Sequence, residues 1–280
     1  MRKHWDRLFV LLLSLSLIVL GILTIRQIYF VNQIKPYSLR EADLVLSGSP
    51  EMIKENVERK ILPEIKVQIK NIMEDENDYL PDYTETDIDK MVVSRGIPFL
   101  RIEDANQLKI DKHSIIHTFK MSQDSQDEKW MFIVYLDDKP TCFNFSVGID
   151  ANNHYYIDYI ELKGYRLAQL LHIYGENKNE NDIIDTYLLC ARHYFLVGKK
   201  KDHNEIAMKG PTTMVNVPCD ERFGIYEIES YTVYPAEVIN QLLEKIKIGN
   251  DQLHKNENNY RISREKIRGT GAFIGIERKL

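Results

Sequence analysis

The chain has 280 residues, of which 44% are hydrophobic and 28% charged, a composition that excludes an intrinsically disordered chain. Residues 1–35 hold five basic residues and one acidic residue, so the total charge of −5 leaves −9 on the remainder. This acidic remainder argues against a nucleic-acid partner, because binding to phosphates needs a basic face. The three cysteines, Cys142, Cys190 and Cys219, exclude a disulfide scaffold, although one bridge between Cys190 and Cys219 is compatible with export.

The N-terminal segment is apolar. Residues 8–25 carry no charge, and apolar residues continue past Arg26 to Val31. A membrane-spanning helix needs about 20 apolar residues, whereas the core of a cleaved signal peptide has about 7–15 and precedes small residues. We therefore predict a partner in the lipid bilayer and four regions: a cytoplasmic tail at 1–7, a transmembrane signal-anchor helix at 8–31, a stalk at 32–48 and an extracytoplasmic α+β domain at 49–280.

The orientation of this anchor depends on the basic residues beside it. Three precede the span and three follow it: Arg2, Lys3 and Arg7, then Arg26, Lys35 and Arg40. The first three are tightly clustered and adjoin the N-terminal amine, which favours an N-terminus inside and a C-terminal domain outside the cell membrane. The reverse orientation would make the domain a cytoplasmic sensor with reduced thiols.

The next elements are predicted helices. Ser49 is a suitable N-cap and Pro50 suits the first helical position, so a helix is expected over 50–62. The same period continues through Ile65, Ile69 and Ile72. Residues 74–89 carry eight acidic residues and no basic one, which predicts a loop. Carboxylates bind calcium, but the glycine of an EF-hand loop is missing, so a solvated loop without a metal is expected.

A β-rich stretch follows, because Ile, Val, Phe and Tyr are concentrated between turn residues. The segment 130–136 is apolar on both faces, which predicts a central strand. The expected strands are 97–102, 115–121, 130–136, 141–149 and 154–162.

The C-terminal half contains further predicted helices and strands. One helix carries Leu167, Leu170, Leu171 and Tyr174 and should end at Gly175. A second should begin at Asn181 or Asp182 and place Ile184, Tyr187, Leu188 and Ala191 on one face. A strand at 223–234, a helix from Pro235 to Gly249 and a closing strand from Ala272 to Ile276 complete the pattern. This order predicts an α+β fold with a mostly antiparallel sheet and packed helices.

Two pairs of residues have spacings known from reactive sites. His113 and His117 would put two metal ligands on one face of a helix, but the glutamate of zinc peptidases is absent and a strand is expected here. Cys190 and His193 would form a thiol–imidazole pair on a helix, although unpaired cysteines are commonly buried as small apolar groups. Gly269-Thr270-Gly271 lacks the Walker lysine. We therefore predict no catalytic residue, metal or cofactor.

Tyrosines are abundant, with 16 in the chain. Their rigid, amphipathic rings suit a groove that binds a peptide or glycan, whereas the alternative is that they fill half-buried strand positions. Asn144-Phe145-Ser146 matches a glycosylation acceptor but lies within a predicted strand. The predicted ligand-binding residues are Tyr155, Tyr156, Tyr159, Tyr231 and Tyr234.

These features predict a single-pass membrane protein whose extracytoplasmic domain binds or positions a protein or glycan partner in the cell envelope. Its role would be assembly or regulation without catalysis. One alternative is an anchored hydrolase that uses His113, His117, Cys190 or His193. The other is the membrane-anchored sensor that faces the cytoplasm.

Overall fold

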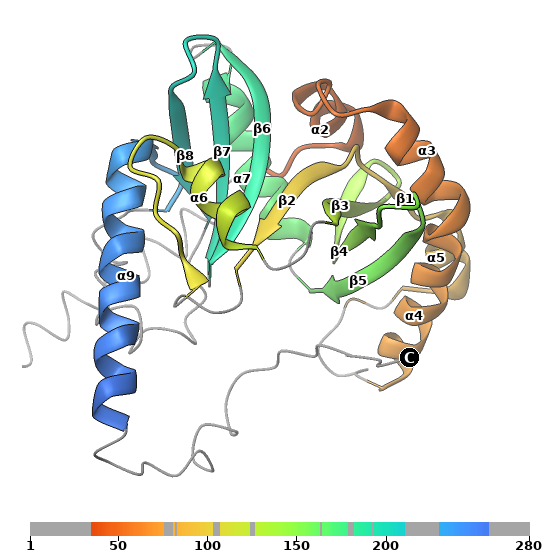
Figure 1. The fold of residues 1–280 in the computed structure, drawn as a ribbon. Helices are drawn as coiled ribbons and strands as arrows, with labels where there is room; N and C mark the ends of the chain where they lie inside the picture. Colours follow the sequence, from red (N-terminus) through yellow and green to blue (C-terminus); the bar gives the residue numbers. More distant parts are fainter. Residues whose placement is uncertain are drawn as a thin grey trace, which may run out of the picture. The chain divides into compact units, whose positions relative to one another are not determined.

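A computed structural model describes residues 35–257 except 76–80, 82, 103–106, 124–126, 163, 179–181, 192 and 211–229 (Figure 1). The described residues from Pro36 onward belong to one compact unit. Within them, no helix has both the length and the apolar character needed to cross a bilayer. The predicted transmembrane helix at 8–31, Cys219 and the predicted closing strand Ala272–Ile276 lie outside the described residues.

The first helix falls within the predicted stalk. Helix α2 (Leu39–Val45) begins at Ser38, whose side chain and that of Glu41 form a reciprocal capping box. Ala42 and Leu46 are buried, at 0% and 2% exposure, so this segment packs as part of the domain. The folded unit therefore already includes residues that the sequence analysis assigned to a stalk.

Helices α3 (Glu51–Lys60) and α4 (Leu62–Asp75) confirm the helices predicted from the isoleucine spacing. The prediction of a loop over all of 74–89 was wrong at both ends. Helix α4 reaches Asp75, and α5 (Glu85–Lys90) begins with a capping box between Thr84 and Asp87. The acidic residues that indicated a loop include the one that satisfies the backbone at the start of this helix.

The strands form one nine-stranded sheet in the described residues, with the order β5-β4-β3-β2-β6-β7-β8-β9 and β1 paired to β3. Only β2 and β6 pair in parallel within this sheet, which confirms a mixed α+β fold with a mostly antiparallel sheet. The strands are β1 (Val92–Val93), β2 (Ile97–Arg101), β3 (Glu128–Leu136), β4 (Lys139–Ile149), β5 (Tyr155–Glu161), β6 (Ile183–Ala191), β7 (His193–Lys200), β8 (Glu205–Lys209) and β9 (Val233–Pro235).

Helices α3 to α5 cover one face of β3, β4 and β5. Phe132 and Phe145 pair across β3 and β4 and stack with ring centres 5.5 Å apart. They pack in one apolar cluster with Val57 of α3, Ile65 of α4 and Ile88 of α5. The predicted central strand β3 is confirmed, since Met131 through Tyr135 are buried on both faces.

Helices α6 (Ile115–Ser122) and α9 (Ala236–Glu257) cover β6, β7 and β8. The prediction of a strand at 115–121 was wrong. Ile115, Ile116 and Phe119 gave the segment a strand-like composition, but all three lie on the buried side of a helix. Helix α9 begins at Ala236, one residue after the predicted start at Pro235. It continues past the predicted end at Gly249 to Glu257.

Helix α7 (Gly164–Lys178) lies on the opposite face of the sheet. Its Tyr174 hydroxyl is 3.0 Å from Thr186 Oγ1, and Thr186 alternates with Tyr187, which packs toward α6 and α9. The predicted helix stop at Gly175 was wrong. This glycine instead allows α2 and the residues before it to pack closely, because an added Cβ would lie 2.7 Å from Val45 Cγ2 and 2.6 Å from the Tyr37 hydroxyl.

The second predicted helix of this region is strand β6, which corrects the prediction for residues 182–191. Leu188 and Leu189 are neighbours in sequence and both are fully buried, which a strand covered on both faces allows. Of the strand predicted at 223–234, residues 223–229 lie outside the described part and the last two belong to β9.

Candidate functional site

The five predicted tyrosines do not form one groove. Tyr155 packs toward α3, where its hydroxyl is 3.3 Å from Asn56 Nδ2 and its ring lies under Lys60. Tyr231 is buried near the end of β8, and Tyr234 packs toward the core beneath α6 and α9. Three of the five lie on β5, the outermost strand beside β4 (Figure 1).

A β-bulge decides which way the β5 tyrosines point. Ser146 pairs with Tyr159, whereas the next residue of β4 pairs with Ile157, so Asp158 is the extra residue. Tyr156 and Tyr159 therefore share the face that α7 partly covers, and Tyr155 lies on the other face. Two predicted ligand residues are thus brought to one face by an irregularity that the sequence pattern did not reveal.

A polar network surrounds Tyr159 on this face. Its hydroxyl lies 3.2 Å from the hydroxyl of Tyr194 on β7, which donates to the Glu161 carboxylate. Asn144 Nδ2 also lies 3.4 Å from Glu161 Oε2, and the Arg101 guanidinium is 5.0 Å from the centre of the Tyr159 ring. The network thus joins strands β2, β4, β5 and β7.

Burial raises the pKa of both Tyr159 and Tyr194 well above its ordinary value. Both side chains are therefore neutral at physiological pH and act as hydrogen-bond donors and acceptors, not as nucleophiles. Tyr159 was predicted from the sequence, but Arg101, Asn144 and Tyr194 of this network were not, because they come from strands distant in sequence. Asn144 is fully buried in this network, so the glycosylation sequence around it is not accessible in the folded domain.

The bulge residue is held by neighbouring strands. Asp158 accepts a hydrogen bond from Ser146 Oγ at 2.7 Å and pairs with Lys129 Nζ at 2.9 Å. Further along β5, Tyr156 donates to Asp127 Oδ2 at 2.7 Å. Burial and then this carboxylate raise the pKa of Tyr156. These bonds fix the side chains on the face of β5 while its outer backbone edge stays uncovered by any described strand.

Apolar side chains are exposed on and just after this strand. Tyr156 is 37% exposed, Leu162 39% and Tyr165, in the first turn of α7, 43%. Single exposed apolar residues need no explanation, but a group on one continuous stretch beside an open sheet edge is typical of a binding surface. This surface, which comprises strand β5 with Tyr156, then Leu162 and Tyr165, is the candidate partner-binding site.

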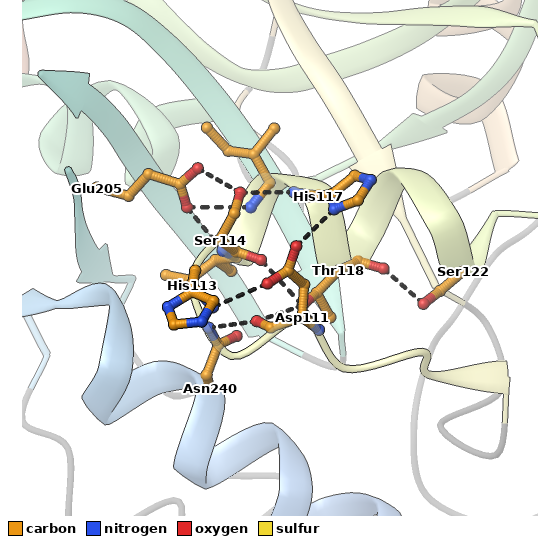
Figure 2. Close-up of polar contacts among 10 residues, drawn as sticks. Asp111, His113, Ser114, His117, Thr118, Ser122, Glu205 and Asn240 are labelled. Atoms are coloured by element: carbon orange, nitrogen blue, oxygen red, sulfur yellow. Dashed lines mark hydrogen bonds and ion pairs between the residues drawn. The ribbon is translucent and has the colours of Figure 1, made fainter. Parts of the chain in front are cut away.

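A second polar network connects α6 with β8 and α9 (Figure 2). The buried Glu205 carboxylate accepts hydrogen bonds from Ser114 Oγ at 2.6 Å, Ile115 N at 2.6 Å and Ile116 N at 3.2 Å. It thereby satisfies backbone groups at the start of α6, where a negative charge is also favoured by the helix dipole. Asn240 of α9 donates to the Asp111 carbonyl at 2.9 Å and closes the network from the other side.

The predicted histidine pair lies at the rim of this network. His113 precedes the N-cap Ser114 and lies outside α6, so His113 and His117 do not lie on successive turns of one helix face. His117 Nδ1 instead lies 2.6 Å from Asp111 Oδ2, and this hydrogen bond lowers the pKa of Asp111. The described residues contain no group of three or more side chains arranged to hold a metal ion.

The predicted thiol–imidazole pair also has a different geometry. Cys190 lies on β6 and His193 on β7, in neighbouring strands and not on one helix. Cys142 lies beside Tyr83, and burial raises the pKa of its thiol to about 11. The predicted glycine-rich turn at Gly269–Gly271 lies outside the described residues.

A third feature is a shallow hollow of about 470 Å³ beside α2 and the start of α3. Its polar wall is internally bonded, since the backbone N–H of Arg95 donates to Asp43 at 2.6 Å, its guanidinium pairs with Glu51, and Lys54 binds Asp43. These contacts hold α2 and α3 against the strand region near Arg95.

Comparison with models of known protein families, with curated proteins and with solved structures found no match to this chain. The assignment of function therefore rests on the residues and contacts described above.

Proposed function

We propose that the chain is a single-pass membrane protein whose domain lies outside the cytoplasm and binds a protein partner in the cell envelope. The binding surface comprises strand β5 with Tyr156, then Leu162 and Tyr165, and the role is to position or regulate that partner. The uncharged run at residues 8–25 supports the anchor, and the cluster of basic residues before it supports the orientation.

One observation carries the choice of surface: exposed apolar side chains lie on the outermost described strand, directly after it, and in the first turn of α7. Tyr156, Leu162 and Tyr165 are each more than a third exposed. Tyrosine is favoured at interfaces because its ring buries a large area with little loss of conformational entropy. The bonds of Tyr156 to Asp127 and of Asp158 to Lys129 hold this surface in one arrangement before a partner binds.

The partner surface can be tested in native membranes with a photo-crosslinking residue at position 156 of the full chain. The matched control carries the same residue at Val67, which is 57% exposed on α4. We expect a discrete protein adduct from position 156 and none of the same mass from position 67. No adduct at position 156, or the same adducts at both positions, would contradict this surface.

The orientation is tested separately, with a reporter fused after Leu280 that is active only outside the cytoplasm. We expect activity and a chain that stays in the membrane fraction. An inactive reporter, together with protection of the domain from added protease in intact cells, would reject the external location and favour the cytoplasmic sensor.

A further inference from the structure

Strand β5 has a free backbone edge. It pairs only with β4, and from Tyr155 to Ile160 no backbone hydrogen bond to any other described segment is present. In an antiparallel strand, alternate residues direct N–H and C=O groups to the unpaired side. The outer side of β5 therefore presents backbone donors and acceptors that another extended chain can bind, in two stretches separated by the bulge at Asp158.

The two terminal strands of the described sheet, β9 and β5, differ in how well they can pair with a further strand. At the far end, β9 has three residues and finishes in Pro235, which has no N–H to offer. Strand β5 has seven residues and contains neither proline nor lysine. The bulge at Asp158 interrupts it, but the carboxylate of Asp158 is neutralised by Lys129 at 2.9 Å and does not stand alone against an incoming strand.

We propose that β5 binds an extended segment of the partner protein as an additional strand of the sheet. This inference rests on the proposed function and names how the partner is recognised. Main-chain hydrogen bonds would supply the attachment, and side chains of the segment would lie alternately beside Tyr155 on one face and Tyr156 on the other.

Charge further defines the segment. The side chains at and beside β5 include the acidic residues Asp127, Asp150 and Glu161, in addition to Asp158, which Lys129 neutralises, and residues 36–280 as a whole carry −9. A segment with basic residues is therefore favoured. A second copy of β5 is disfavoured, because it would bring the same acidic residues of two chains together.

The test uses a phage-displayed library of random nonapeptides, selected against the full chain in detergent micelles. A selected peptide is then synthesised with one backbone N-methyl group at a time, which removes single N–H donors. We expect at least tenfold weaker binding at alternate positions and little change at the positions between them. Hydrogen exchange of residues 155–161 should slow when the peptide binds.

Three results would overturn strand addition: no selected peptide, a loss of affinity that does not alternate, or exchange protection elsewhere than β5. A full chain that dimerises with protected β5 amides would assign the edge to a second copy and overturn the partner segment. If position 156 still crosslinks a membrane partner in any of these cases, the proposed function stands and only strand addition fails. Loss of that adduct as well would reject both.

Discussion

The Glu205 network and the β5 surface are both rich in polar groups, but they differ in how those groups are satisfied. Glu205 is 6% exposed and accepts three hydrogen bonds from the start of α6. At β5, the side chains are bonded to neighbouring strands while the outer backbone groups have no partner strand among the described residues. The polar groups of the first region are satisfied within the chain, whereas the second is the region for which we propose a further strand.

This difference separates a structural role from a binding role more clearly than residue type does. Figure 2 shows histidine, aspartate, serine and glutamate in a small volume, a set that resembles catalytic machinery by composition. Yet Ser114 Oγ donates to Glu205 and accepts from the backbone N–H of His117, so no imidazole activates it. The β5 surface has no such residue set, but its outer backbone groups from Tyr155 to Ile160 have no hydrogen-bond partner among the residues that the structure describes.

The largest expected effect is on the closed network, where Glu205→Ala should lower the free energy of unfolding by about 3 kcal/mol, since it leaves the Ser114 hydroxyl and two buried N–H groups without their acceptor. Thermal unfolding of the full chain, followed by the fluorescence of buried Trp130 in a Trp5→Phe background, measures this. Glu205→Gln keeps the size and an acceptor oxygen and should lose less. Equal loss in both variants would contradict the role of the hydrogen bonds.

A smaller effect, on binding alone, is expected at the open surface. Tyr156→Lys combined with Tyr165→Lys should reduce partner crosslinking in native membranes about tenfold, equivalent to about 1.4 kcal/mol, because both rings are exposed at the candidate surface. The melting temperature should stay close to that of the unmodified chain, because Tyr165 is exposed and a lysine at position 156 can still bind the Asp127 carboxylate that the tyrosine hydroxyl binds. The control is Val67→Lys, which should alter neither quantity. Unchanged crosslinking by the double variant would remove these rings from the interface.

Two buried groups outside both polar regions, Cys142 and Tyr83, should make the stability of the chain depend on pH. Burial raises the pKa of the Cys142 thiol to about 11 and that of Tyr83 to about 12, so the folded state favours their neutral forms. The contribution of the thiol to stability is complete below about pH 9, its ordinary pKa, and is lost as pH rises through 11. The contribution of Tyr83 is complete below about pH 10 and is lost as pH rises through 12. Thiolate absorbance of a Cys190→Ser, Cys219→Ser variant should show a midpoint near pH 11. A midpoint near 9 would show that the thiol is not buried in this way.

The smallest effect is expected at the rim of the closed network. His117 is 56% exposed, and its pairing with Asp111 is screened by solvent. His117→Gln should leave the thermal unfolding of the full chain indistinguishable from that of the unmodified chain. A large loss of stability would show that this pair supports α6 as strongly as Glu205 does.

Local patterns in the sequence were sufficient for several elements. The isoleucine period predicted α3 and α4, and segments rich in Ile, Val, Phe and Tyr between turn residues predicted β2, β3, β4 and β5. They failed where tertiary contacts determine the outcome. Residues 115–122 become helical with Glu205, 90 residues away, bound at their first turn, and residues 183–191 become a strand because helices cover both of their faces.

The candidate site divides in the same way. The sequence identified Tyr155, Tyr156 and Tyr159, since a strand rich in tyrosine is visible in a single segment. It could not show that Tyr231 and Tyr234 lie elsewhere, that a bulge puts Tyr156 and Tyr159 on one face, or that β5 ends the sheet. Strand order and register depend on which distant segments meet, and one-dimensional periodicity carries no information on that pairing. The sequence by itself thus determined the acidic character of residues 36–280, the apolar N-terminal run and those helices and strands that have a clear local pattern, whereas only the tertiary structure decided which strand lies at the edge of the described sheet.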